Sequence, residues 1–168
     1  MYSVRKASKN DIPLIQELCL QVWPQTYKDI ISQEQIEFML EKMYGTENLL
    51  NQLQSGFLFF ILFDELTPIG YAGMERTDDD CFKLHRLYVI IENHRKGAGS
   101  YFLSQIEQFV TEQSGSTIEL QVNRANSAVE FYKKRGFYIV KEADFDIGNG
   151  FYMNDFIMRK DITFAAIN

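Results

Sequence analysis

The sequence predicts a mixed α/β domain with a mostly antiparallel sheet of about seven strands flanked by helices. Apolar residues recur at helical spacing in the first third of the chain and form strand-like runs in the middle. The last third alternates strands with helices. With 168 residues, 46% of them hydrophobic and 24% charged, the chain has the composition of a globular protein. No repeat, low-complexity tract or linker interrupts it, so residues 1–168 are interpreted as a single domain.

The first third is expected to hold one short strand and three helices. The strand covers Tyr2–Ala7, and the first helix covers Asp11–Val22, where Pro24 is expected to end it. The second helix follows Ser32, whose spacing to Gln35 is that of a capping box. The third helix covers Thr46–Ser55.

The middle of the chain predicts three strands joined by polar turns, which is typical of an antiparallel meander. The strands are Phe57–Phe63, Ile69–Arg76 and Cys81–Ile91. The run Phe57–Phe63 is the longest apolar stretch, and a membrane-spanning helix needs about 20 residues. It is therefore expected to be a buried strand, and no membrane partner is expected.

The last third predicts two helices and three strands. Gly136 is expected to end the second helix. In chain order the elements are a helix over 97–112, a strand over Thr117–Val122, a helix over Ala125–Arg135, and strands over Phe137–Ala143 and Phe151–Lys160.

The charge balance argues against a nucleic-acid partner. Seventeen basic and twenty-three acidic residues give a net charge of −6, which favours cationic small molecules or basic peptides. Cys19 and Cys81 form no CxxC motif or Cys/His cluster, so no metal site is expected. The presence of only two cysteines also predicts that the protein works in the reducing cytoplasm. The N-terminus lacks the apolar run of a signal peptide.

A glycine-containing loop, His94–Ser100, joins a predicted strand directly to a predicted helix. The first N–H groups of a helix have no intrahelical partners, and the helix dipole places partial positive charge there. Gly97 and Gly99 leave the backbone open, and Arg95 and Lys96 add positive charge. The loop is a candidate pyrophosphate cradle. The alternative is a structural turn, since neither a Walker A motif nor the third glycine of a dinucleotide fingerprint is present.

A second informative segment runs from Asn126 to Phe137. Asn126 or Asn123 caps its helix, and Tyr132 lies on the same face as Ala128 and Val129. Tyr132 either fills core or brings its hydroxyl to the polar end of a ligand.

Together the two segments resemble the signature segments of the GNAT superfamily of N-acetyltransferases. The first family pattern is [Gln/Arg]-x-x-Gly-x-[Gly/Ala], and Gly97 and Gly99 occupy its small positions. His94 departs from it, because the family prefers Gln or Arg there. The second pattern is matched by Asn126, Phe131, Tyr132, Lys134, Gly136 and Phe137.

The resemblance implies that acetyl-CoA lies where the sheet splits between its fourth and fifth strands. The pantetheine would pair with the backbone of Leu87 and Val89 and meet Asn126, and the pyrophosphate would lie on the N–H groups of 95–100. The cofactor-binding residues it implies are Leu87, Tyr88, Val89, Arg95, Lys96, Gly97, Ala98, Gly99, Ser100, Asn126, Tyr132 and Lys134.

Transfer to an amine needs a base and an acid, because a free ammonium group with a pKa near 10.4 cannot attack. The resemblance implies that Tyr132 protonates the departing sulfur. His85 shares a strand face with Leu87 and Val89 by alternation, and an imidazole titrating near 6.5 suits a base. Polyamine-type members of the family often place a Glu at this position. The alternatives are a histidine hydrogen-bonded within the sheet and a base acting through ordered water.

The acceptor is expected to be a small cationic, polyamine-like primary amine. The run Asp146–Met158 and the segment Leu87–Val89 resemble bacterial family members that acetylate such amines. Trp23, Tyr27 and the acidic turn Asp78–Asp80 are candidates to line its site, or else are core residues and a solvated turn.

Three other functions stay open: acetylation of a peptide or protein amine, a non-catalytic acyl-CoA-binding or regulatory module, and a protein–protein adaptor. Residues 163–168 either form a homodimer contact or fray.

Overall fold

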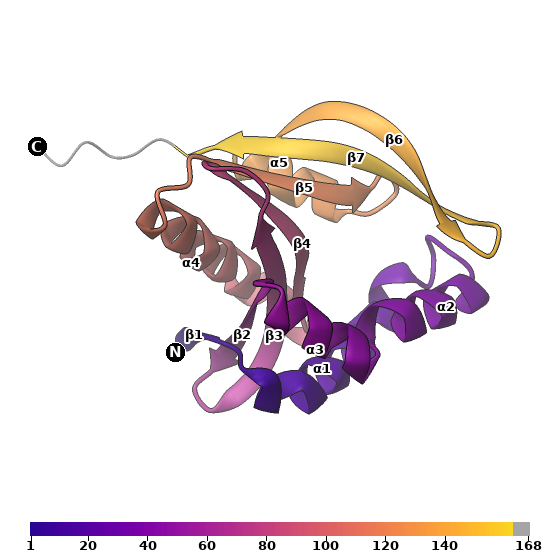
Figure 1. Cartoon of the computed structure of the whole chain (residues 1–168), viewed down its shortest axis with the longest axis horizontal. Coiled ribbons are helices and arrows are strands. Elements are labelled where there is room, and N and C mark those ends of the chain that lie inside the picture. The colour runs from indigo at the N-terminus through magenta and orange to yellow at the C-terminus, as the bar shows by residue number, and fades with distance from the viewer. Residues whose placement is uncertain (163–168) are drawn as a thin grey trace, which may run out of the picture. The chain divides into compact units, whose positions relative to one another are not determined.

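The structure is a computed structural model that describes residues 1–162 (Figure 1). Its seven strands form one sheet in the order β1-β2-β3-β4-β5-β7-β6, which confirms the mixed α/β class. The expectation for 163–168 lies outside the described residues. The elements are β1 (Tyr2–Lys6), η1 (Lys9–Asp11), α1 (Ile12–Tyr27), α2 (Gln33–Tyr44), α3 (Thr46–Gln54), β2 (Leu58–Asp64), β3 (Thr67–Arg76), β4 (Cys81–Val89), η2 (Ile91–Lys96), α4 (Ala98–Glu112), β5 (Thr117–Asn123), α5 (Ala128–Lys134), β6 (Tyr138–Gly148) and β7 (Phe151–Asp161).

The chain divides into two compact units. The first comprises Met1–Glu75 and His85–Ile106, and the second comprises Arg76–Leu84 and the chain from Glu107 onward. Strand β4 and helix α4 each contribute residues to both units.

In the first unit, β1 pairs antiparallel with β2 and β2 pairs antiparallel with β3; the sequence predicts the second of these pairings. Helices α1, α2 and α3 pack on one another in the same unit (Figure 1). Its most deeply buried large side chains include Ile15, Leu18, Trp23, Phe59, Ile61 and Tyr71.

Helix α1 does not end at Pro24, so this sequence prediction is wrong. Proline lacks the N–H that would bond the carbonyl of Leu20, but only that bond is lost. The Lys28 N–H donates to the Pro24 carbonyl at 3.2 Å, and the helix runs to Tyr27. The Trp23 and Tyr27 rings then lie 4.6 Å apart, both buried, and their packing offsets the missing bond.

Buried polar side chains connect the helices of the first unit to its strands. The Trp23 indole N–H donates to the Tyr44 hydroxyl at 3.0 Å, and the Tyr44 and Tyr71 hydroxyls are 2.6 Å apart. Burial raises the pKa of both tyrosines, which keeps them neutral. Trp23 therefore is a core residue and does not line an amine site.

Arg86 on β4 is also buried in the first unit. Its guanidinium carbon lies 4.8 Å from the centre of the Tyr44 ring and within 5.5 Å of the rings of Phe57 and Phe59. Nη1 donates to the Gln52 side-chain oxygen at 3.1 Å. These contacts join β4 to β2, α2 and α3 without a carboxylate.

In the second unit, β5 pairs in parallel with the start of β4 and antiparallel with β7. The β4–β5 register joins Cys81–Leu84 to Thr117–Leu120 and ends there. Strands β6 and β7 form the long curved hairpin coloured orange to yellow in Figure 1. Strand β6 extends to Gly148 rather than Ala143, because Asp144–Asp146 and Gly148 also pair with β7, with a register shift between Asp146 and Gly148 just before the turn at Asn149 and Gly150.

Candidate functional site

The predicted cradle is formed by a left-handed glycine between two helices. Strand β4 ends at Val89 rather than Ile91, and the 3-10 turn η2 leads to Gly97, whose φ is +79°. A Cβ at Gly97 would meet no atom within 4 Å, so this side of the loop is open. The Tyr101 N–H makes the first helical bond, to the Gly97 carbonyl at 3.0 Å. The N–H groups of Ala98, Gly99 and Ser100 precede it and have no intrahelical partner.

Side-chain hydrogen bonds hold this loop to the sheet. The Tyr2 hydroxyl on β1 donates to the Lys96 carbonyl at 3.1 Å. His94 Nε2 lies 2.7 Å from the Val89 carbonyl, and because a carbonyl only accepts, this nitrogen carries the proton. His94, at the position where the family prefers Gln or Arg, thus joins η2 to the end of β4. It uses one lone pair of the carbonyl that was expected to face the pantetheine.

His85 forms a pair with a carboxylate on the neighbouring strand. Its Nε2 lies 2.7 Å from Glu75 Oε1, and both side chains are partly exposed. The Phe57 ring packs 5.2 Å away. In this structure His85 is therefore hydrogen-bonded within the sheet, which is one of the alternatives that the sequence left open. Glu75 was not identified from the sequence, although it is an acidic residue near the end of an otherwise apolar strand.

The close approach of β3 to the end of β4 depends on Gly70. A Cβ at this position would lie 2.5 Å from the Tyr88 carbonyl oxygen, which no side chain permits. The Ile90 N–H donates to the Ile69 carbonyl at 2.8 Å. The backbone of Tyr88 and Val89 is therefore held firmly against β3.

Tyr132 lies in the second unit, buried on α5. Its ring packs 5.3 Å from Phe131 and 5.4 Å from Phe137. Gly136, with φ of +89°, follows the end of α5 as predicted, and the Phe137 N–H donates back to the Tyr132 carbonyl.

Two asparagines order the turn before α5. Asn123 Oδ1 accepts from the Ala125 N–H and Asn126 Oδ1 from the Ala128 N–H, each at 2.9 Å. The helix begins at Ala128 rather than Ala125, because these side-chain bonds stabilise a turn in place of its first residues. Lys134 is exposed at the end of α5.

The predicted residues therefore form two groups. His85, Leu87–Val89 and the loop 95–100 belong to the first unit, whereas Asn126, Tyr132 and Lys134 belong to the second. The acidic turn Asp78–Asp80 is exposed, and Asp80 accepts from Ser116 at 2.8 Å, as in a solvated turn.

Asp155 is a further residue that was not identified from the sequence. It is only 5% exposed on β7, and its Oδ1 has no hydrogen-bond partner among the described residues. Burial raises the pKa of this carboxyl group to about 6. The sequence carries one signal for it: Asp155 lies two residues before Ile157, so alternation along the strand places this acidic residue on the same face as an apolar one.

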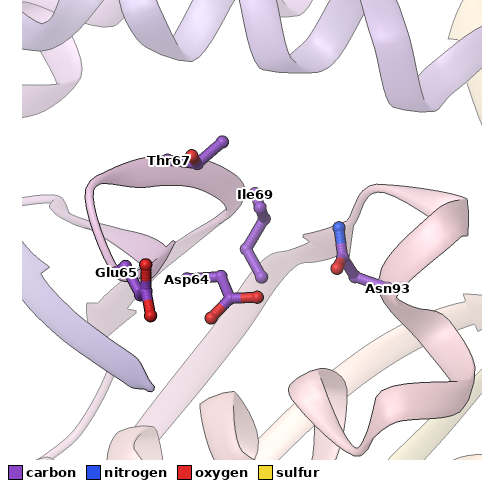
Figure 2. A pocket seen from close by; sticks show the side chains of 5 residues that line it. All are labelled: Asp64, Glu65, Thr67, Ile69 and Asn93. Carbon is purple, nitrogen blue, oxygen red and sulfur yellow. The ribbon is translucent and has the colours of Figure 1, made fainter.

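A cavity of about 430 Å³ lies elsewhere in the first unit. Figure 2 shows Asp64, Glu65, Thr67 and Ile69, from β2, β3 and their turn, with Asn93 of η2. Asp64 pairs with the N-terminal ammonium group at 3.1 Å. None of the residues predicted to bind acetyl-CoA or the amine acceptor lines this cavity, so we do not assign it to either substrate.

Among residues 1–162, no group of three or more His, Cys, Asp or Glu side chains could hold a metal ion. Within the same range, no helix is long and apolar enough to cross a membrane.

The strand order, the open helix N-terminus after β4 and the glycine-ended helix after β5 are the features that the sequence resemblance predicts for an acyltransferase that uses acyl-CoA. The chain belongs to the GNAT family, because the model described as "Acetyltransferase (GNAT) domain" matches residues 27–153. The acetyl donor in this family is acetyl-CoA.

Relatives and solved structures agree with this assignment. A Thermoplasma acidophilum protein named spermidine N(1)-acetyltransferase is 32% identical, over 94% of this chain and 95% of its own length. An uncharacterised N-acetyltransferase from Bacillus subtilis, YuaI, is 26% identical over 88% of this chain and 86% of its own. The crystal structure of the PaiA N-acetyltransferase of Thermoplasma acidophilum with coenzyme A has a TM-score of 0.81 and 31% identity, and covers 96% of this chain and 99% of that one.

Gly97→Ala should weaken acetyl-CoA binding roughly 10- to 100-fold, the loss expected for a backbone hydrogen bond to a charged group. Its Cβ would project into the open side of the cradle. Gly56→Ala is the matched control, because Gly56 also has a positive φ and an open Cβ position but lies outside the cradle. Both variants should lose similar stability to left-handed strain. Titration calorimetry and thermal unfolding measure the two quantities, and equal acetyl-CoA affinity in both variants would contradict the cradle.

Proposed function

We propose that this chain transfers the acetyl group of acetyl-CoA to a primary amine of a small polyamine such as spermidine. The observation that carries the proposal is the similarity, over 94% of the chain, to a protein named for spermidine acetylation. The net charge of −6 supports a cationic acceptor, because an acidic surface attracts cations.

The first unit would hold the donor. The N–H groups of 95–100, together with the charge of Lys96, would bind the pyrophosphate at the start of α4. The backbone of Leu87 and Val89 would pair with the pantetheine, and Tyr88 between them is held by its hydroxyl contact with Tyr27 at 2.9 Å. From the second unit, Asn126 and Lys134 would complete the donor contacts. When bound, the thioester supplies the acetyl group.

His85 would take the proton of the attacking ammonium group. If Nε2 donates to Glu75, the ring presents Nδ1 as its acceptor. The neutral amine nitrogen then attacks the thioester carbon and the carbon–sulfur bond breaks. The Tyr132 hydroxyl gives its proton to the departing thiolate, and the second proton that the nitrogen loses as the amide forms returns to the Tyr132 oxygen through solvent.

Release of free coenzyme A from acetyl-CoA, measured against polyamines, amino acids and lysine peptides, tests the proposal. Spermidine should give the highest kcat/KM. Acetyl-CoA alone should raise the thermal midpoint, since saturation at a hundredfold excess over Kd adds about 2.7 kcal/mol. Transfer only to peptides would replace the polyamine with a peptide acceptor. Stabilisation by acetyl-CoA with no transfer to any amine would favour a non-catalytic acyl-CoA-binding module.

Tyr132→Phe should lower kcat about 10²- to 10⁴-fold while leaving acetyl-CoA affinity unchanged, because only the proton donor is removed. Stopped-flow thiol release and calorimetry measure the two effects. Tyr138→Phe is the control, since this exposed tyrosine lies on β6 outside the proposed site. Full turnover in the Tyr132 variant would exclude Tyr132 as the acid.

His85→Gln should lower kcat about 100-fold and flatten the acid limb of the pH–rate profile, because the amide cannot accept the amine proton. Glu75→Gln should give a smaller loss, since the imidazole remains but its orientation is less fixed. A His85→Gln profile that overlays the wild-type profile would place the base elsewhere, for instance on an ordered water.

A further inference from the structure

Tyr2 contacts the candidate cradle although 94 positions separate it from the loop in the sequence. Its hydroxyl donates to the Lys96 carbonyl at 3.1 Å, and its ring lies 5.7 Å from the ring of Tyr101 in the first turns of α4. On β1 its backbone is opposite Asp64 of β2. All of these residues belong to the first unit, so Tyr2 is fixed by β2 at its backbone and by α4 at its ring.

The hydroxyl of Tyr2 is not needed for the packing of its ring. A phenylalanine would present the same ring to Tyr101 and the same backbone to β2. What the hydroxyl adds is a hydrogen bond to Lys96, the last residue of η2. The last carbonyl groups of a helix have no intrahelical partner, so the side chain of Tyr2 supplies one from a distant strand.

This bond determines how the peptide group between Lys96 and Gly97 is oriented. A trans peptide group is planar, so its carbonyl and its N–H point in opposite directions, and residues 1–162 contain no cis peptide bond. With the Lys96 carbonyl held by Tyr2, the Gly97 N–H points away from Tyr2. That N–H is one of the groups proposed to bind the pyrophosphate.

Without the bond, little in the loop would keep this peptide group in one orientation. Gly97 has a φ of +79°, and glycine adopts positive and negative φ about equally readily. A Cβ on Gly97 would meet no atom within 4 Å, and both Lys96 and Gly97 are exposed. Rotation of the peptide group therefore meets no packed side chain at Gly97, and it would turn the N–H away from a bound phosphate.

We propose that Tyr2 is a positioning residue for the acetyl donor, whose hydroxyl holds the Lys96–Gly97 peptide group with the Gly97 N–H directed at the pyrophosphate. The inference rests on the donor placement in the proposed function. Tyr2 acts through the backbone of the loop and does not contact the donor. It lowers the ordering cost of binding at the phosphate end and has no part in the steps at the thioester.

Tyr2→Phe removes the hydroxyl and keeps the ring. The Kd for coenzyme A, measured by calorimetry, should rise about 2- to 10-fold, the range for the loss of one neutral hydrogen bond. The kcat at saturating acetyl-CoA and the KM for the amine acceptor should not change. Tyr138→Phe is the matched control, because it also removes one exposed hydroxyl bond, to Asp161 at 3.3 Å, but lies outside the cradle. The two variants should lose similar thermal stability, and only Tyr2→Phe should lose affinity for coenzyme A.

Donors that differ at the phosphate end separate positioning from a general structural role. Acetyl-CoA and acetyl-dephospho-CoA both carry the pyrophosphate, whereas S-acetyl-pantetheine lacks it. Tyr2→Phe should lower kcat/KM by the same factor for the first two donors and leave it unchanged for S-acetyl-pantetheine. A loosened fold would lower all three alike.

A double-mutant cycle with Gly97→Ala tests whether Tyr2 acts through this peptide group. Changes at independent sites add, whereas changes that act on one group do not. In the Gly97→Ala background, Tyr2→Phe should therefore change the affinity for coenzyme A by less than about twofold. Full additivity would show that Tyr2 acts elsewhere.

Three results would overturn the inference: unchanged affinity for coenzyme A in Tyr2→Phe, equal losses with and without the pyrophosphate, or full additivity with Gly97→Ala. None of them bears on transfer to a polyamine, which is measured in the wild type. A wild type that binds coenzyme A and acetylates no amine would overturn the proposed transfer and leave the role of Tyr2 standing. A wild type that does not bind coenzyme A would overturn both.

Discussion

The buried guanidinium of Arg86 determines which way the side chains of β4 point. It lies against three aromatic rings and donates to Gln52, so the helix-facing side of the strand is fixed at this residue. Because side chains alternate along a strand, His85 and Leu87 must face the other way. If the two faces of β4 were exchanged, the His85 ring would take the buried place of Arg86 among the aromatic rings. The guanidinium of Arg86, with its five donors, would then take the place of His85 beside Glu75. The orientation of the candidate base therefore follows from where an arginine can be buried.

At the end of β4 in the first unit, several contacts fix the backbone where the cofactor is proposed to bind. Gly70 allows the carbonyl of Tyr88 to approach β3, His94 bonds the carbonyl of Val89, and Gly97 turns the chain into α4. Each contact uses backbone that would otherwise be free to move. What is left is a short strand edge and a set of helix N–H groups that these contacts hold in place. Such preorganisation lowers the ordering cost of binding.

Those parts of the fold and of the candidate site that depend on local chemistry could be predicted from the sequence. The glycine end of α5 and the β2–β3 pairing follow from turn residues and apolar period. Pro24 was misjudged because the packing of Trp23 on Tyr27 outweighs one lost hydrogen bond, and packing of that kind is a tertiary effect. The contacts of His85 with Glu75, ten residues away, depend on strand register, which one sequence does not reveal. Asp155 was missed for the same reason: its burial is set by strands β5 and β6, both distant in sequence.

Arg86 and Asp155, the buried charged residues within 1–162, have different physical explanations. Arg86 is surrounded by π faces and has acceptors for its terminal nitrogens, although its Nε remains unpaired. Its loss would remove packing between four elements of the first unit, so its burial is explained by structure. Asp155 Oδ1 has no hydrogen-bond partner within residues 1–162, and Arg124 beside it donates to the Asp155 backbone oxygen and to Asp144. Burial raises the pKa of its carboxyl group to about 6, so its ionisation above that pH weakens the fold, whereas the permanent charge of Arg86 is stabilised by the rings around it.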